Sequence, residues 1–148
     1  MDNQLVRFTK GLLDLMFYLG ILVTLAVPAI FKWVGNYLTD FQTYYLPQTV
    51  LYMLSGVASL LIILELRRMF ATVLRDDAFV MDNVGSLKRM AWSSFAIAGF
   101  SILRLLYAPT PATAVVILVF FIAGPFSLVL AQVFEKAIQY KEENDLTI

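Results

Sequence analysis

Four long stretches without a charged residue divide this chain into segments of membrane-crossing length. They cover residues 15–31, 41–64, 90–103 and 105–134. An α-helix rises about 1.5 Å per residue, so about 20 apolar residues cross a hydrocarbon layer about 30 Å thick. The sequence therefore predicts an integral membrane protein that crosses a lipid bilayer four times.

The composition excludes several classes of protein. With 60% hydrophobic and 15% charged residues, the chain lacks the polar surface of a soluble domain. Its 11 basic and 11 acidic side chains cancel, so bulk charge does not indicate direct binding to nucleic acid. There is no cysteine and no histidine, which removes thiolate and imidazole chemistry. We expect no catalytic residue, no cofactor and no metal site, although an ion site made of carboxylates alone stays open.

We expect one integral membrane domain, residues 1–148, folded as an all-α four-helix transmembrane bundle. Its predicted spans are residues 12–33, 47–64, 87–107 and 112–134. The third span has the shortest uncharged core, and it reaches membrane length if Lys88, Arg89 and Arg104 extend to opposite surfaces. Gly124-Pro125 predicts a kink in the fourth span. Small residues spaced four apart, as at Ser55/Ser59 and Ser94/Ala98, favour close helix packing within the bundle or in a homo-oligomer.

Basic residues next to the predicted spans lie mostly on one side. Nine belong to the N-terminal segment, the middle loop and the C-terminal tail, and only Lys32 and Arg104 belong to the two opposite loops. Cytoplasmic loops carry the excess of lysine and arginine. We therefore predict a multi-pass protein of the bacterial cytoplasmic membrane with both termini in the cytoplasm. A cleaved signal peptide in place of the first span is the competing interpretation, and 17 uncharged residues are long for one.

Residues 65–86 are predicted to form a cytoplasmic helical hairpin between the second and third spans. Apolar side chains at helical spacing between Leu66 and Leu74 continue the second span, and Asp82 stands where the N-cap of the next helix is expected. Phe79 would lie at the tip. The apolar face either packs within the hairpin or on lipid headgroups, or it docks another protein.

The cytoplasmic tail, residues 135–148, is expected to continue the fourth span as a helix as far as Asn144. The last four residues have some strand preference. Their carboxylate would suit capture by a partner, and a frayed terminus is the alternative.

Two charges lie close to the ends of predicted spans. Asp14 is expected to pair with Lys10 one turn back, or with Lys88 or Arg89 across the bundle. Arg104 is expected to extend to the opposite membrane surface. No ionisable residue falls in the middle of a span, which argues against a pump or carrier. A lipid-active enzyme that uses Asp14 or a tail carboxylate as its base is the least favoured interpretation.

Two stretches of the chain resemble a known family. One runs from Phe79 to Trp92, with Asn83 four residues after Phe79 and Leu87-Lys-Arg89 entering the third span. The other is the acidic C-terminal segment, residues 142–148. In both, the chain resembles the domain-of-unknown-function 2975 family of small bacterial four-span membrane proteins. The resemblance brings no enzymatic activity, but it implies a genetic neighbour, because such proteins are commonly encoded beside a small helix-turn-helix transcription regulator.

Both stretches fall on the predicted cytoplasmic side, the only side that such a regulator can reach. We therefore hypothesise a non-catalytic membrane protein that binds or sequesters the regulator and releases it when the bundle changes shape around Gly124-Pro125. The predicted partner-binding residues are Phe79, Asn83, Leu87, Arg89, Asp145, Leu146, Thr147 and Ile148. An equal interpretation of Asn83 and Arg89 is structural, as links between the hairpin and the acidic tail. A small transport or permeability subunit is the alternative function.

Overall fold

The computed structural model describes residues 3–146. This part of the chain is entirely helical apart from its connections, as the all-α prediction requires. The helices are α1 (Asn3–Val34), α2 (Thr39–Thr43), α3 (Tyr45–Leu74), α4 (Met81–Arg104) and α5 (Pro111–Leu146). The short helix α2 lies in a segment that the sequence did not predict to be helical.

Three helices are long and apolar enough to cross a membrane, namely α1, α3 and α5. Large apolar side chains such as Leu22, Leu25, Leu118 and Ile122 point outward from α1 and α5. Such a surface is suited to lipid, because monomeric soluble proteins rarely expose apolar patches of this extent. The fourth long helix, α4, has 24 residues and carries charges near both ends, so its apolar centre is shorter.

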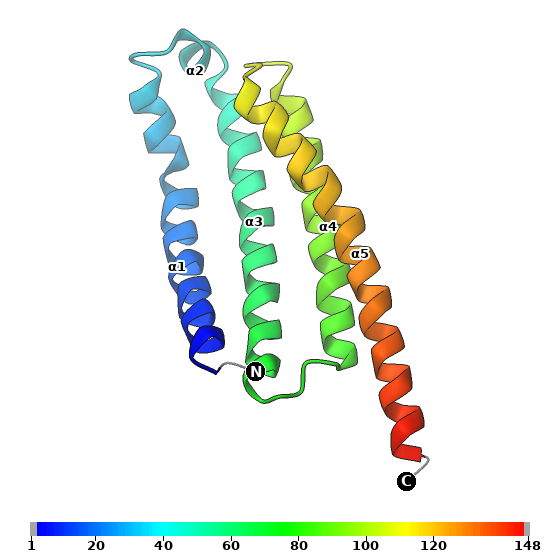
Figure 1. Cartoon of the computed structure of the whole chain (residues 1–148). Helices are drawn as coiled ribbons and strands as arrows, with labels where there is room; N and C mark the ends of the chain where they lie inside the picture. The colour runs from blue at the N-terminus through cyan, green and yellow to red at the C-terminus, as the bar shows by residue number, and fades with distance from the viewer. Residues whose placement is uncertain (1–2, 147–148) are drawn as a thin grey trace.

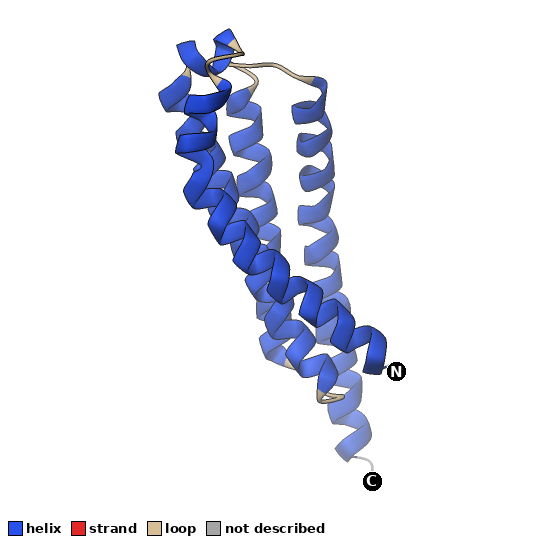
Figure 2. Ribbon diagram, turned by 90° about the vertical axis from the view of Figure 1, so that its left-hand side faces the viewer, coloured by secondary structure: helices blue, strands red, loops and turns tan. Residues whose placement is uncertain are grey.

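The long helices form an open row rather than a closed bundle. Helix α1 packs on α3, α3 packs on α4, and α4 packs on α5, whereas α1 contacts neither α4 nor α5 (Figure 1). In Figure 2 the helix nearest the viewer, α1, runs obliquely across the others. The all-α fold is confirmed, but a closed four-helix bundle is not, because each long helix packs on its neighbours along the chain.

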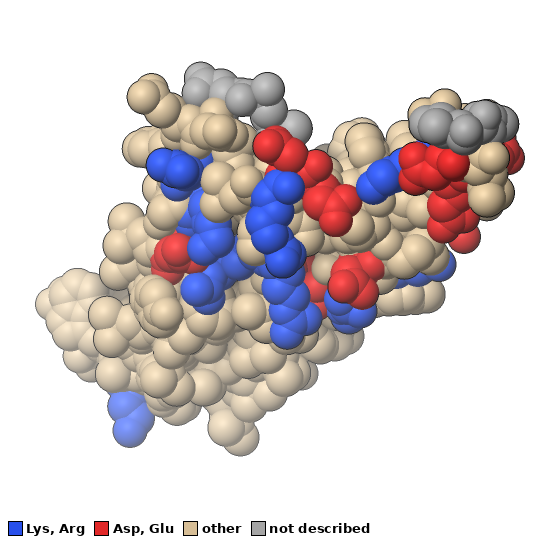
Figure 3. All heavy atoms as spheres, turned by 90° about the horizontal axis from the view of Figure 1, so that it is seen from below, with Lys and Arg blue, Asp and Glu red and all other residues tan. Residues whose placement is uncertain are grey.

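The two ends of the molecule differ in charge. The start of α1, the end of α3, the start of α4 and the end of α5 lie together at one end (Figure 1). Lysine, arginine, aspartate and glutamate side chains gather there (Figure 3). We call this the charged end (residues 3–14, 65–89 and 135–146), and we call the other the opposite end (residues 32–52 and 101–113).

Helix α4 supplies much of the buried surface. Its small residues Ala91, Ser94 and Ala98 are buried, which lets the neighbouring helices approach closely. The prediction that Ser94 and Ala98 lie at a helix contact is confirmed. Nearer the charged end, an apolar cluster joins α4 to α5 through four buried side chains: Val84, Leu87, Ala131 and Ile138.

Gly124 marks a close approach between α5 and α4. A Cβ atom at this position would lie 2.6 Å from the Phe95 ring of α4, so only glycine fits without movement. Helix α5 continues through Pro125 as one element, and α1 likewise continues through Pro28. The glycine therefore serves a packing contact that the sequence did not predict.

The helix ends near the hairpin differ partly from expectation. Helix α3 continues to Leu74, as the apolar spacing predicts. Asp76 follows with φ 53°, a left-handed conformation that aspartate tolerates after a helix end. Helix α4 begins at Met81 with Val80 at the N-cap and no side-chain capping bond, so the predicted N-cap at Asp82 is wrong. The aspartate lies in the first turn instead, where its charge complements the helix dipole.

The helix of the tail is longer than predicted. Helix α5 extends to Leu146, two residues beyond the predicted end at Asn144. Asp145 and Leu146 are therefore helical rather than extended. Thr147 and Ile148 lie outside the described residues.

Candidate functional site

A buried carboxylate joins α3 to α4 at the charged end. Glu65 Oε1 accepts a 2.7 Å hydrogen bond from Arg89 Nε, and Oε2 accepts one of 3.1 Å from an Arg89 Nη atom. Arg68 lies 3.3 Å from the same carboxylate. The bidentate geometry is the strongest that arginine and a carboxylate form. Glu65 was not predicted as a site residue, although an acid at the end of one predicted span and Arg89 at the start of the next were a usable signal.

Asn83 holds the 75–80 loop against α3. Its amide nitrogen donates to Thr72 Oγ1 at 2.8 Å and to the Ala78 carbonyl at 2.7 Å. The residue is only 2% exposed, so it offers almost no surface to a partner. The structural interpretation of Asn83 and Arg89 fits these contacts. The expected links to the acidic tail are not the ones formed. Asn83 bonds to Thr72 of α3 and to the loop, and Arg89 bonds to Glu65 of α3.

Phe79 and Leu87 occupy different environments. The Phe79 ring packs edge-on against Phe134 of α5, with 5.1 Å between ring centroids, and still leaves 45% of the residue exposed. Leu87 is buried in the apolar cluster between α4 and α5. Phe79 is therefore available at the surface, whereas Leu87 stabilises the helix contact beneath it.

The described part of the tail is exposed. Asp145 and Leu146 both point into open space at the end of α5. Lys141 links this helix to the loop through a 3.2 Å ion pair with Asp77. Of the eight predicted partner-binding residues, four present exposed surface in the structure: Phe79, Arg89, Asp145 and Leu146.

A groove of about 640 Å³ lies between the end of α3 and the start of α4. Its walls carry three arginines, together with Thr72, Asn83 and Asp82. We call it the basic groove and define its basic residues as Arg68, Arg75 and Arg89. Within the described chain Arg75 forms no ion pair or hydrogen bond through its side chain, while the other two share Glu65. Three guanidinium groups therefore line the groove together with one carboxylate, that of Asp82, while Glu65 pairs with two of the three arginines.

Asp14 joins α1 to α3 beside this region. Its carboxylate lies 2.6 Å from Arg67 Nε and 3.5 Å from Lys10 Nζ. The predicted pairing with Lys10 is confirmed, and the alternatives Lys88 and Arg89 are wrong. Arg67 was not predicted as a partner, because the rotation of α3 that brings it toward α1 cannot be derived from local sequence.

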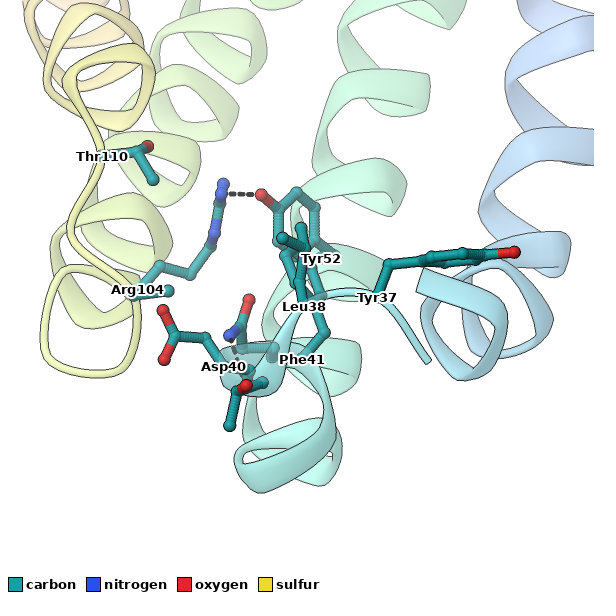
Figure 4. A pocket seen from close by; sticks show the side chains of 10 residues that line it. Tyr37, Leu38, Asp40, Phe41, Tyr52, Arg104 and Thr110 are labelled. Atoms are coloured by element: carbon teal, nitrogen blue, oxygen red, sulfur yellow. Dashed lines mark hydrogen bonds between the residues drawn. The ribbon is translucent and has the colours of Figure 1, made fainter. Parts of the chain in front are cut away.

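A second polar site lies at the opposite end. Arg104 turns inward rather than toward the surface: its guanidinium donates to the Tyr52 hydroxyl and, at 3.4 Å, to Thr113 Oγ1. It lines a pocket of about 480 Å³ between α2, α3 and α4 (Figure 4). Arg104 was predicted to extend to the opposite membrane surface; it does lie at that end of the molecule, but its partners Tyr52 and Thr113 were not predicted.

Neither site has the ligand set of a metal centre. Within residues 3–146, no three acidic side chains converge as cation ligands would. The chemistry that both sites offer is recognition of charged groups by arginine and hydroxyl donors.

Comparison with known proteins gives one match. No curated protein and no solved structure matches the chain significantly. One family model matches residues 30–148, which include the basic groove, the pocket at Arg104 and the whole of α3, α4 and α5. Because this match covers well over half of its length, the chain belongs to DUF2975, a family of proteins of unknown function.

Proposed function

We propose that this chain is a non-catalytic four-span protein of the bacterial cytoplasmic membrane that binds or sequesters a cytoplasmic partner at its charged end. The fourth span in this proposal is α4. Its 24 residues correspond to about 36 Å of helix, enough to cross a bilayer. It packs between α3 and α5, both apolar enough to span, and its terminal charges can reach the two membrane surfaces.

The charge distribution supports a cytoplasmic location for the charged end. Nine of the 11 basic residues belong to the segments that meet there, and two belong to the opposite end. Excess lysine and arginine mark the cytoplasmic side of bacterial membrane proteins. Both termini and the 75–80 loop would then face the cytoplasm.

Two observations carry the binding function: the basic groove, and an exposed aromatic ring in the loop that joins the two helices of the groove. Arg75 has no partner within the described chain, and Phe79 follows it closely in the loop with almost half of its surface exposed. Arginine and aromatic residues are enriched among the residues that dominate binding energy at protein interfaces. A partner that presents a carboxylate beside an apolar side chain would complement this surface.

The family resemblance suggests a small helix-turn-helix regulator as the partner. Sequestration at the membrane would keep such a regulator from its DNA. Release would follow a change in the angle between α3 and α4, because the groove is built on the ends of these two helices. The Glu65–Arg89 and Asn83–Thr72 contacts join the same helix ends, so they would hold the groove in its binding shape.

The test is co-purification of the tagged protein with the regulator encoded beside it, from a mild detergent. Arg75→Glu and Phe79→Ala should each reduce the recovered regulator at least tenfold, whereas Lys136→Glu should leave it unchanged. Lys136 is an exposed lysine of the charged end that does not line the groove. Equal recovery with all three variants would refute the proposed surface.

Transport is the second candidate function. The buried hydroxyls of Ser55 and Ser101, on α3 and α4, have no hydrogen-bond partner in the described chain and provide polar groups within the membrane region. Solute flux into vesicles that contain the purified protein would favour this candidate if Ser55→Ala and Ser101→Ala reduced it.

A further inference from the structure

The pocket at the opposite end combines two charges of opposite sign that do not pair. Arg104, the last residue of α4, and Asp40, in the first turn of α2, both line it (Figure 4). None of the ion pairs formed within residues 3–146 includes either residue. The two charges therefore face one cavity and remain available to a ligand.

Arg104 is held in place by neutral groups. Its donors reach the hydroxyls of Tyr52 and Thr113, and its guanidinium lies over the Tyr52 ring at 3.5 Å from the centroid. Tyr52 belongs to α3 and the buried Thr113 to α5, so both helices hold the Arg104 side chain in position. A partly buried guanidinium normally gains a carboxylate or phosphate partner. Here no protein carboxylate fills that role within the described chain.

Asp40 supplies the complementary group. Its side chain makes no hydrogen bond or ion pair with the described chain, while its backbone carbonyl accepts from the buried Gln48 at 3.4 Å. That bond attaches α2 to α3 and keeps the carboxylate at the pocket wall. A carboxylate in this position favours a ligand with a protonated amine.

We propose that this pocket binds a small zwitterion, with its phosphate or carboxylate at Arg104 and its primary ammonium group at Asp40. The volume of about 480 Å³ is typical of small-molecule sites. Tyr37 and Phe41 add aromatic walls. The ligand is either a free amino-phosphate or amino acid, or the headgroup of a lipid such as phosphatidylethanolamine. This site needs no cytoplasmic partner, so it stands or falls independently of the proposed function.

The chain contains its own reporter for binding. Trp33 packs edge-on against Tyr37, with 5.3 Å between ring centroids, and Tyr37 lines the pocket. The only other tryptophan is Trp92. In a Trp92→Phe background, Trp33 is the remaining tryptophan, and its fluorescence reports on the pocket through Tyr37.

The first experiment titrates O-phosphoethanolamine into this protein in lipid-free detergent. A saturable change in Trp33 fluorescence is expected, and phosphocholine, whose quaternary ammonium cannot donate a hydrogen bond, should bind at least tenfold more weakly. The second compares nanodiscs of phosphatidylcholine with nanodiscs that contain one-third phosphatidylethanolamine. A response to the soluble probe with no difference between nanodiscs identifies a free ligand. A difference between nanodiscs identifies the lipid headgroup.

Variants test the two charges separately. Arg104→Gln and Asp40→Asn should each weaken phosphoethanolamine binding by about tenfold or more, as expected for loss of one charge-assisted contact. Lys32→Gln should leave it unchanged, because Lys32 is the other basic residue of this end and does not line the pocket. The proposal is wrong if neither probe gives a saturable response. It is also wrong if phosphocholine and phosphoethanolamine bind with equal affinity. That comparison keeps Arg104 and Asp40 unchanged, so it does not depend on the folding of either variant.

Discussion

The carboxylate of Glu65 and the guanidinium of Arg89 meet across two adjacent helices, with Oε1 of the acid 2.7 Å from Nε of the arginine. Their environments are unequal: the Glu65 side chain is 8% exposed and that of Arg89 is 56% exposed. The acid is therefore the dehydrated partner, and it depends on the arginine for its hydrogen bonds. The pair joins α3 to α4, and its arginine lines the basic groove.

Replacing Glu65 by glutamine should destabilise the protein by about 1–3 kcal/mol, because the amide has no charge and only one oxygen to accept the two bonds from Arg89. Arg68 and Arg89 would lose their shared carboxylate, but both are exposed enough to regain water. A lower midpoint of unfolding in a dodecyl sulfate titration would measure the effect.

Glu142→Gln is the matched control for this change. Glu142 is exposed on the last turns of α5 and forms no contact with Arg68 or Arg89. Its replacement should alter the free energy of unfolding by less than about 0.5 kcal/mol. If the two variants unfolded alike, the Glu65–Arg89 pair would not stabilise the helix contact.

Asn83→Ala should release the 75–80 loop. The variant removes both donors that hold Thr72 and the Ala78 carbonyl, at an expected cost of about 1–3 kcal/mol. Amide hydrogen exchange should become faster across the loop and the first turn of α4, and should stay unchanged in the middle of α5.

Thr72→Val separates the two bonds of Asn83. It removes the Oγ1 acceptor but keeps the side-chain shape and the bond to Ala78, so its effect should be smaller than that of Asn83→Ala. The double variant should lose less free energy of unfolding than the two single variants together, because both changes delete the same bond. Strict additivity would mean that the Asn83–Thr72 contact contributes nothing.

Features that depend on local sequence could be predicted. The helical character of each apolar stretch, the extension of α3 to Leu74 and the pairing of Asp14 with Lys10 all follow from residues three to eight positions apart. Periodicity and one-turn spacing determine such features.

Features that depend on how helices rotate against one another could not be predicted from the sequence. At the charged end many acids and bases lie within reach, and the choice of Arg67 for Asp14 and of Arg89 for Glu65 depends on packing between α1, α3 and α4. The open row is a second example. Short loops place consecutive helices side by side, but they do not determine whether α5 closes against α1.

The pocket at Arg104 shows the same limit. The sequence placed this arginine at the end of a predicted span, where an extended side chain is the usual outcome. Its inward turn depends on Tyr52, which lies 52 residues earlier, and on Thr113 after the turn. Asp40 reaches the same pocket because α2 packs against the start of α3, where Gln48 donates to the Asp40 carbonyl.

Gly56 on α3 should not tolerate alanine. A Cβ at this position would lie 2.6 Å from Thr24 Oγ1 and 3.3 Å from Thr24 Cβ, so α1 would have to move away. Overpacking of this kind costs about 1–3 kcal/mol. Unfolding in detergent should show the loss for Gly56→Ala, and the additional change Thr24→Ala should recover part of it.

Gly99→Ala is the control for helix glycines. Apart from the neighbouring backbone of α4 itself, no atom of the described chain lies within 4 Å of the Cβ that this change adds. The variant should be as stable as the natural chain, or slightly more stable, since alanine favours the helix over glycine. If Gly99→Ala lost as much stability as Gly56→Ala, the loss at Gly56 could not be assigned to the contact with Thr24.

The proposed topology predicts which positions a reagent outside the cell can reach. The chain has no cysteine, so single cysteines can be introduced without removing any. A membrane-impermeant maleimide should label Asn36→Cys in intact cells and should label Ala78→Cys only after the membrane is opened. Both residues lie in connections between helices, where a small side chain is tolerated. Asn36 and Ala78 lie at opposite ends of α3, so this pair tests whether α3 crosses the membrane.

A third position tests α4. Ala78 and Thr110 lie at opposite ends of α4, so Thr110→Cys should be labelled from outside like Asn36→Cys. If Thr110→Cys were protected together with Ala78→Cys, α4 would not cross the membrane, and the protein would have three spans.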